Sequence, residues 1–175
     1  RTPRLVRGVV FYTSEMWFQR RPRADIHAED PDGRQAAIDA GEAGQCALRR
    51  IVRRDPDAGV RNAAVRRLHD LVVLRQVLEQ ESDETVRETA RVRYRQLLAG
   101  GDTLDINYRR AALAACPDRQ IIAHVARSAR EPALRLAALA RVDEPGLLEE
   151  VRDHDPDATV RARAADRVRH LAAKG

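Results

Sequence analysis

The sequence Asp-Pro-Asp-Ala-Gly-Val-Arg at residues 55–61 recurs almost unchanged as Asp-Pro-Asp-Ala-Thr-Val-Arg at residues 155–161. Weaker copies lie at residues 82–87 and 130–135, and a degenerate copy lies at residues 30–34. We take the apolar residue before each Arg as the anchor of its unit. Successive anchors are 26, 22, 26 and 26 residues apart, and they are Val60, Val86, Tyr108, Leu134 and Val160. One further step of 26 residues back from Val60 reaches the degenerate copy. The sequence therefore predicts six units in one register, one of them shortened.

Each unit is predicted to form two short helices. Asp caps free N–H groups and Pro is tolerated in a first helical turn, so the Asp-Pro-Asp sequence marks the start of the first helix. Small or apolar residues recur 4, 5 and 8 positions after the anchor, for example at Ala64, Val65 and Leu68. The second helix carries apolar residues 14 and 17 positions after the anchor, such as Leu74 and Val77. Because so small a unit cannot bury its apolar stripe alone, neighbouring units must stack.

The composition agrees with stacked helices. Aromatic residues make up only 3% of the 175 residues, so Ala, Leu, Val and Ile must form the core, which suits closely packed helices. We predict an all-α fold, a right-handed α-solenoid of about six helix-pair repeats over residues 26–175, preceded by a separate segment at residues 1–25. Cys46 and Cys116 show neither paired nor metal-binding spacing, which fits a reducing cytoplasm. No apolar run approaches the roughly 18 residues that would span a membrane.

The repeat resembles the HEAT-like repeats of bacteria, in which an Asp-Pro-Asp-x-x-Val-Arg-x-x-Ala sequence opens each short unit. The resemblance covers residues 27–174 and implies the superhelical fold described above. A narrower resemblance is to the N-terminal repeat array of an uncharacterised bacterial family that places a coiled coil after its repeats. The residues that carry it are Phe18, Arg21, Pro22, His27, Asp30, Pro31 and the segment 134–139. This resemblance implies no active site.

The net charge of +5 lies entirely in the N-terminal segment. Residues 1–23 hold six Arg and one Glu, whereas the remaining residues carry equal numbers of bases and acids. The segment also holds most of the aromatic residues; its candidate contact residues are Trp17, Phe18, Arg20, Arg21 and Arg23. Three interpretations are open. The segment caps the exposed end of the first repeat, it contacts nucleic acid or an acidic partner, or part of it derives from an expression vector.

One Arg follows each anchor, at Arg61, Arg87, Arg109, Arg135 and Arg161. In a functional interpretation these guanidinium groups bind phosphate or carboxylate ligands. In a structural interpretation each Arg bridges to an acid of its own or an adjacent start turn, such as Asp55 or Asp155, and holds the stack in register. The structural interpretation is favoured because each Arg follows an acidic turn and the array is neutral.

Residues with catalytic or metal-binding chemistry form no familiar pattern. Helix capping explains the acids of the start turns without paired-carboxylate catalysis. The five His show no His-x-x-x-His spacing and no His-Glu dipeptide. HEAT-like hydroxylases, which resemble this fold, use repeated His-Glu dipeptides to hold their iron centre. Cys116 occupies a core position, and Gly100-Gly101 is predicted to end a helix. We therefore expect no cofactor, no metal and no enzymatic activity.

The sequence favours a non-enzymatic protein-interaction scaffold. A stacked array offers an extended concave surface, and exposed positions of the second helices should line it together. These positions are Arg49, Arg50, Arg53, Arg54, Arg75, Glu79, Arg127, Glu149, Glu150 and Arg152. The first four would suit a protein partner with an acidic segment. The alternative, by resemblance to HEAT-like DNA glycosylases, is nucleic-acid binding through the basic region 20–67, which the neutral array disfavours.

Overall fold

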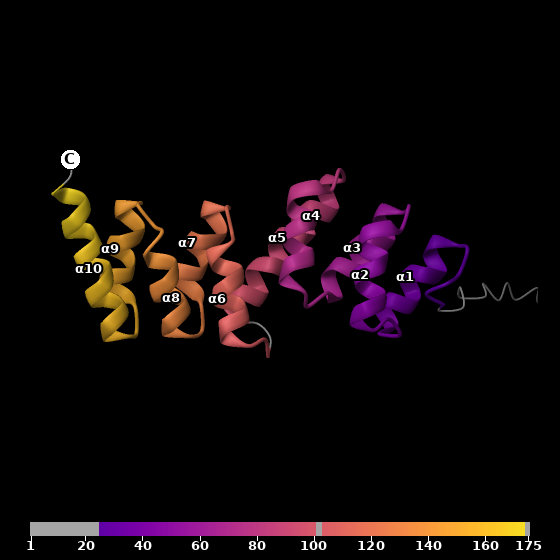
Figure 1. The fold of residues 1–175 in the computed structure, drawn as a ribbon, viewed down its shortest axis with the longest axis horizontal. Coiled ribbons are helices and arrows are strands. Elements are labelled where there is room, and N and C mark those ends of the chain that lie inside the picture. Colours follow the sequence, from indigo (N-terminus) through magenta and orange to yellow (C-terminus); the bar gives the residue numbers. More distant parts are fainter. Residues whose placement is uncertain (1–24, 101–102, 174–175) are drawn as a thin grey trace, which may run out of the picture.

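All regular structure in the described part of the chain is α-helical. The computed structural model describes residues 25–100 and 103–173, and its ten helices form an elongated row from α1 to α10 (Figure 1). They are α1 (Pro31–Ala40), α2 (Gln45–Arg54), α3 (Ala58–Arg67), α4 (Leu71–Gln80), α5 (Glu84–Ala99), α6 (Ile106–Ala114), α7 (Arg119–Ser128), α8 (Pro132–Leu139), α9 (Pro145–His154) and α10 (Ala158–Ala172). The prediction of an all-α fold is confirmed. None of these helices is long and apolar enough to cross a membrane.

Asp side chains begin most of the helices. A carboxylate oxygen of Asp57 accepts the backbone N–H of Val60 at 2.9 Å, and Asp157 does the same for Val160 at 3.1 Å. The same cap begins α1, α4, α5, α6 and α7, at Asp30, Asp70, Asp83, Asp105 and Asp118. Each carboxylate satisfies N–H groups that lack a partner within the helix. The helix starts predicted at the two Asp-Pro-Asp sequences are therefore confirmed.

The Asp-Pro-Asp sequences lie inside tight helix hairpins. α2 packs closely on α3, α4 on α5, α7 on α8 and α9 on α10, whereas the two helices of one predicted unit make few contacts with each other. The turn at residues 55–57 therefore joins the second helix of one unit to the first helix of the next. The hairpin, rather than the predicted unit, is the closely packed pair.

Two of the six predicted units contain a single long helix. The prediction of two helices per unit is wrong for the units of Val86 and Val160, because α5 and α10 continue through the place where the other units turn. α5 ends at Gly100, whose φ of 98° is left-handed and favours glycine, so this residue is the helix stop that the sequence predicted.

The chain consequently repeats a five-helix pattern. α5 and α10 share Thr-Val-Arg at their starts, and Arg87 and Arg161 are 74 positions apart, as are Arg61 and Arg135. We call α1–α5 module 1 and α6–α10 module 2. In each module four short helices are followed by one long helix, α5 or α10.

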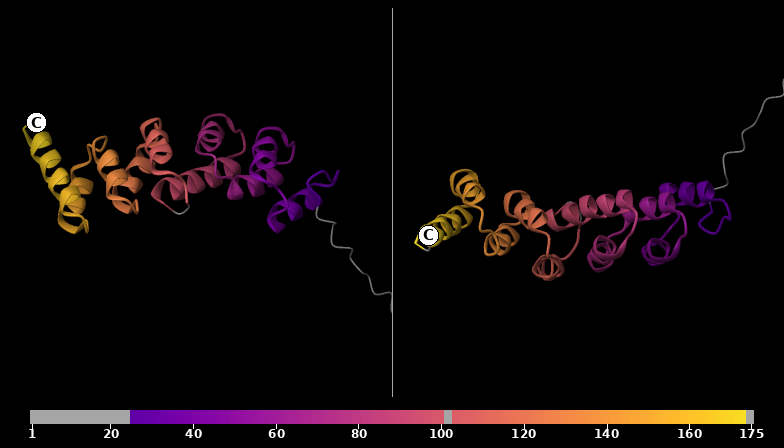
Figure 2. Two further views of the ribbon diagram at one scale, coloured as in Figure 1. Left: turned by 60° about the horizontal axis from the view of Figure 1, so that its bottom comes forward. Right: turned by 90° about the horizontal axis from the view of Figure 1, so that it is seen from above.

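The unit of Val86 has no second helix. As a result, the first helices of the units lie on one side of the row in module 1 and on the other side in module 2. α1, α3, α5, α7 and α9 pack along one side, the odd row, and α4, α6, α8 and α10 pack along the other, the even row, which α2 begins (Figure 2, right). The second helices α2 and α4 thus lie in the even row, whereas α7 and α9 lie in the odd row. The expectation that the exposed second-helix positions line one shared surface is wrong, because the two modules present these helices on different sides.

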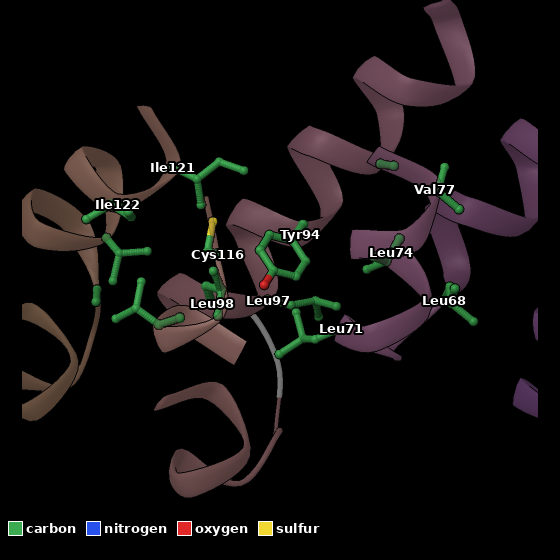
Figure 3. Packing of buried hydrophobic residues seen from close by; sticks show 14 of the residues in the cluster. Leu68, Leu71, Leu74, Val77, Tyr94, Leu97, Leu98, Cys116, Ile121 and Ile122 are labelled. Carbon is green, nitrogen blue, oxygen red and sulfur yellow. The ribbon is translucent and has the colours of Figure 1, made fainter. Parts of the chain in front are cut away.

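One apolar cluster runs through both modules. The predicted stripe positions Leu68, Leu74 and Leu139 are fully buried. Tyr94 is the one aromatic side chain in the described residues that is completely buried, and it lies among Leu97, Leu98 and Cys116 where module 1 meets module 2 (Figure 3). Cys116 is 2% exposed, so its predicted role as a core residue is confirmed.

Candidate interaction surface

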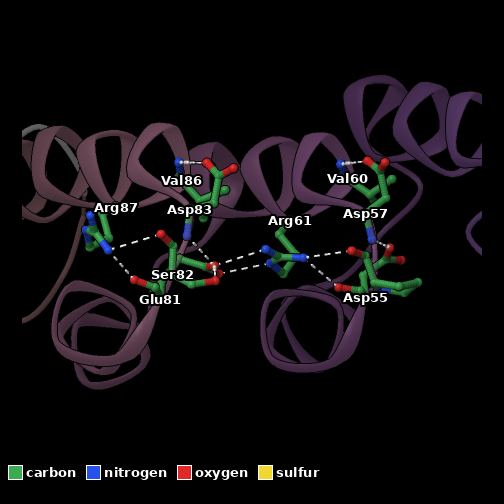
Figure 4. Close-up of polar contacts among 10 residues, drawn as sticks. Asp55, Asp57, Val60, Arg61, Glu81, Ser82, Asp83, Val86 and Arg87 are labelled. Atoms are coloured by element: carbon green, nitrogen blue, oxygen red, sulfur yellow. Dashed lines mark hydrogen bonds and ion pairs between the residues drawn. The ribbon is translucent and has the colours of Figure 1, made fainter.

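Each recurrent Arg can join two successive turns, as Arg61 shows (Figure 4). Its Nη1 donates to the carbonyl oxygens of Asp55 and Pro56, in its own turn, at 2.9 and 3.1 Å. Its Nε and Nη2 donate to the two carboxylate oxygens of Glu81, in the next turn, at 2.9 Å each. A planar guanidinium fits a carboxylate through two parallel bonds, so Arg61 fixes both the distance and the register between neighbouring hairpins.

Three other arginines make the same forward contact. Arg34 pairs with Asp55 at 2.9 and 3.0 Å, and Arg135 pairs with Asp155 at 2.7 and 2.9 Å. Arg109 pairs with Glu131 at 2.8 and 2.6 Å. The Arg135–Asp155 pair is the most enclosed, with side-chain exposures of 6% and 2%. We call these residues, with Arg61, the forward arginine row.

The forward row stops at the end of each module. Arg87 donates to the carbonyl oxygens of Glu81 and Ser82 and to the nearby Glu84, and among the described residues it contacts no acid of the following turn. Arg161 donates to the carbonyl oxygens of Asp155 and Pro156, and within residues 25–100 and 103–173 no carboxylate lies on its other edge. The structure thus places Arg61, Arg109 and Arg135 in bridges between turns, and Arg87 and Arg161 at module ends.

A second set of arginines points backward along the chain, and sequence reasoning missed it. Arg67, Arg93 and Arg167 donate to the carbonyl oxygens of Asp39, Leu68 and Val142, at or just beyond the end of the preceding first helix. Arg141 donates to Leu113 and Cys116 carbonyls at 2.5 and 2.6 Å. The sequence contains a signal for this row, because each of these arginines stands seven positions after an anchor. In the unit of Tyr108 that position is Ala115, so this row also stops between the modules.

Internal bonding occupies the guanidinium groups of the forward row. The hydrogen bonds from Arg61 hold the pKa of Glu81 below its usual value, and Arg109 does the same to the pKa of Glu131. A guanidinium that already carries a bidentate carboxylate has little capacity left for a phosphate or a substrate. The paired acids are likewise saturated, since Asp55 also accepts the backbone N–H of Asp57 at 3.0 Å.

α2 carries a different kind of arginine. Its exposed side presents Arg49, Arg50, Arg53 and Arg54, and the helix contains no acid. Arg49 contacts Asp70 of α4 at 2.7 Å while its side chain remains 48% exposed, and Arg53 donates to the Gln76 amide oxygen at 3.0 Å. Arg50 and Arg54 make no ion pair or hydrogen bond to any described residue. We call these four residues the α2 arginine face.

A groove lies directly beside this face. It has a volume of about 300 Å³, and its lining residues come from α2, from α4 and from the first residue after α4. They are Val52, Arg53, Val73, Gln76, Val77, Gln80 and Glu81. Val52, Val73 and Val77 are buried, so the groove presents mainly the polar side chains of its other lining residues, beside the unpaired charges of Arg50 and Arg54. This combination suits an acidic segment.

An exposed face of α9, in module 2, is acidic. On α9, Glu149, Glu150 and Asp153 are exposed and are accompanied by one Arg, Arg152. Glu150 accepts from Arg127 of α7 at 2.9 Å, the contact that corresponds to Arg53 and Gln76 in module 1. Glu149 makes no hydrogen bond or ion pair to a described residue. We call Glu149, Glu150 and Asp153 the α9 acidic face.

Burial shifts the pKa of two reactive side chains in the described part of the chain. Burial raises the pKa of the Cys116 thiol, which disfavours the nucleophilic thiolate. Burial, with the nearby Arg95 and Arg127, lowers the pKa of His124, so this residue is neutral at physiological pH. Within the described ranges no group of His, Cys, Asp and Glu side chains is arranged to hold a metal ion.

The predicted contact residues Trp17, Phe18, Arg20, Arg21 and Arg23 lie outside the described residues, so the three interpretations of the N-terminal segment stay predictions. No protein-family model, curated protein or solved structure matches this chain. Its function must therefore be inferred from the geometry of the described residues.

Proposed function

We propose that this chain is a right-handed, HEAT-like α-solenoid that acts as a non-enzymatic scaffold, and that its α2 arginine face binds an acidic segment of a partner protein. The observation that carries the proposal is the contrast between two classes of arginine. Those of the forward row are bonded at fixed geometry inside the array, whereas Arg50 and Arg54 are exposed and have no partner in the described residues.

Several features support the array and its use as a scaffold. The same turn, cap and guanidinium bridge recur along the row, as expected when repeats contact only their neighbours. Such an array exposes a long surface with few buried polar sites, which suits partner binding better than chemistry. Cys46 and Cys116 are both free thiols, in keeping with a reducing cytoplasm as the proposed compartment.

An acidic protein segment fits the α2 arginine face better than nucleic acid does. α2 carries four arginines and no acid on a single short helix, and the described residues as a whole carry equal numbers of bases and acids. A nucleic-acid backbone would need cationic residues along a longer track.

The test is fluorescence anisotropy with a labelled peptide in which a Leu is flanked by Glu and Asp. We expect binding in the micromolar range that weakens with added salt, and about tenfold weaker binding for the Arg50→Ala/Arg54→Ala variant. The matched control is Arg110→Ala/Arg163→Ala, which removes two exposed arginines from α6 and α10. Equal affinity in all three proteins would remove the α2 arginine face from the proposal.

The same titration with single-stranded and duplex oligonucleotides tests the alternative. If an oligonucleotide bound more tightly than the peptide and lost affinity in the Arg50→Ala/Arg54→Ala variant, nucleic-acid binding would replace protein binding as the proposed function. We expect the oligonucleotide to bind more weakly than the peptide.

A further inference from the structure

Among the ten described helices, α2 of module 1 carries the largest positive charge and α9 of module 2 the largest negative charge. α2 corresponds to α7 and α4 to α9, because Arg61 corresponds to Arg135 in the turn and helix between them. The arginines of α2 at positions 49, 50 and 54 correspond to Ala123, His124 and Ser128. The α4 residues at positions 75, 76 and 79 correspond to Glu149, Glu150 and Asp153. Arg53 corresponds to Arg127, and Glu79 to Asp153. Together α2 and α4 carry five Arg and one acid, whereas α7 and α9 carry three Arg and three acids, so the arrangement is basic in module 1 and neutral in module 2, where the acids gather on α9.

The chain cannot bring these two faces together itself. Because the modules exchange sides at α5, α2 and α4 lie in the even row and α7 and α9 lie in the odd row (Figure 2). Arg50 and Arg54 on one side, and Glu149 on the other, remain exposed and unpaired in the described residues. Both faces are available at the same time for another molecule.

We propose that a second copy of this chain is a partner for the α2 arginine face, and that it binds through its α9 acidic face. The proposal rests on the proposed function, since it names an acidic segment for the same site. The argument is charge complementarity. α2 carries four arginines and no acid, whereas the exposed side of α9 carries three acids and one Arg. In such a contact Arg50 and Arg54 meet Glu149, which like them has no partner among the described residues. Glu150 and Asp153 already pair with Arg127 and Arg152 and add negative charge beside Glu149.

The contact is heterologous, because different surfaces meet. Each added copy leaves one α2 arginine face and one α9 acidic face unused, so association continues from end to end or closes into a ring, and it is not limited to a symmetric pair. Because the contact is made by exposed charges, it strengthens at low ionic strength and weakens as the Debye length shortens to about 3 Å in about 1 M salt.

The test is sedimentation velocity of the full chain over a range of concentrations, at low and at high salt. We expect the wild type to associate at low salt. The variants Arg50→Glu/Arg54→Glu and Glu149→Arg/Asp153→Arg should each associate at least about tenfold more weakly. The chain with all four substitutions regains the complementary pair and should associate like the wild type. Arg110→Glu/Arg163→Glu introduces the same charge change away from both faces and should leave association unchanged.

Two results would overturn the inference. One is a wild type that stays monomeric at every concentration at low salt. The other is association that the fourfold exchange does not restore, or that the Arg110→Glu/Arg163→Glu control weakens equally. The peptide titration separates this failure from failure of the proposed function. A monomeric chain that still binds the acidic peptide through Arg50 and Arg54 removes the second copy alone, whereas a chain that does not bind the peptide removes both.

Discussion

Replacing Arg135 with Ala should destabilise this protein more than any exposed charge substitution. Arg135 and Asp155 are almost completely buried and are joined by two bonds of 2.7 and 2.9 Å. The substitution leaves the Asp155 carboxylate buried with only the backbone N–H of Asp157, and it leaves the Ala129 carbonyl without its 2.7 Å donor. Removing one partner of a buried ion pair costs about 3–5 kcal/mol, because the other charge stays desolvated.

For a chain of this size each kcal/mol lowers the melting temperature by about 2–4 °C, so Arg135→Ala should lower it by about 6–20 °C. The assay is thermal unfolding followed by the helical circular dichroism signal, with urea unfolding as a check. Arg75→Ala is the matched control. It breaks an exposed i,i+4 pair with Glu79, with side-chain exposures of 34% and 42%, and should cost about 0.3–0.5 kcal/mol.

Two further variants separate the bridge from simple loss of a side chain. Arg135→Lys keeps the charge but loses the planar fork, so it cannot serve the carboxylate and the Ala129 carbonyl together, and it should fall between wild type and Arg135→Ala. Asp155→Asn, alone and combined with Arg135→Ala, completes a double-mutant cycle that should show strong coupling between the two residues. If Arg135→Ala lowered the melting temperature no more than Arg75→Ala, the bridge would not hold the hairpins in register.

Three other perturbations probe the same design. Arg61 holds the pKa of Glu81 below the usual 4.5, so the unfolded chain takes up this proton first. The stability that the pair adds is present above about pH 4.5 and is lost as pH falls through the lowered pKa, and Glu81→Gln should flatten this acid limb in melting curves measured against pH. Gly100→Ala should lower the free energy of unfolding by about 1–3 kcal/mol, because φ is 98° and the new Cβ would lie 2.9 Å from a nitrogen of Arg109. The measurement is urea unfolding, and an unchanged midpoint would mean that the helix stop tolerates a side chain. Arg141→Ala leaves the Cys116 carbonyl without its Arg141 donor and the Leu113 carbonyl with only the backbone N–H of Cys116, and it should cost about 1–3 kcal/mol. An effect below about 0.5 kcal/mol would mean that the backward row contributes little to stability.

Local signals predicted the helix starts and the core well. Asp57 and Asp157 cap helices because their carboxylates reach N–H groups three residues on, a relation contained in seven letters of sequence. The apolar stripes follow from the 3.6-residue period, so the spacing alone was enough to place Leu68 and Leu74 in the core. The helix stop at Gly100 follows in the same way from a residue that accepts a left-handed φ.

The long helix α5 could have been predicted from what its unit lacks. Other units break at residues 68–70 or 143–145, which contain Asp or Pro, whereas residues 90–98 contain neither Asp, Pro nor Gly. The anchor spacing of 22 indicated a shortened unit, but it did not show that an entire second helix was replaced. The exchange of rows follows from that replacement, and only the three-dimensional packing reveals it.

The candidate interaction surface was predicted in part. The sequence identified Arg49, Arg50, Arg53 and Arg54 as basic and exposed, but it could not show which charges would be consumed by neighbours, because their partners stand some 20 residues away. Arg49 and Arg53 are tied to α4, whereas Arg50 and Arg54 are not. The structure was therefore needed to show which of these arginines have no partner in the described residues.

Different forces hold the modules together internally and join them to each other. Within a module, guanidinium groups bridge successive turns, and both arginine rows end where α5 meets α6. The junction is closed mainly by neutral bonds and apolar packing, with one long ion pair between Arg91 and Asp118 at 3.4 Å. The Tyr94 hydroxyl donates to the Ala112 carbonyl at 3.0 Å, and the Tyr108 hydroxyl accepts the Leu71 N–H at 2.9 Å. Low pH and high salt weaken ion pairs far more than neutral hydrogen bonds. We therefore expect them to destabilise each module mainly through its own arginine bridges, while the junction keeps the two faces on opposite sides. That separation keeps the α2 arginine face from being neutralised by the α9 acidic face of its own chain.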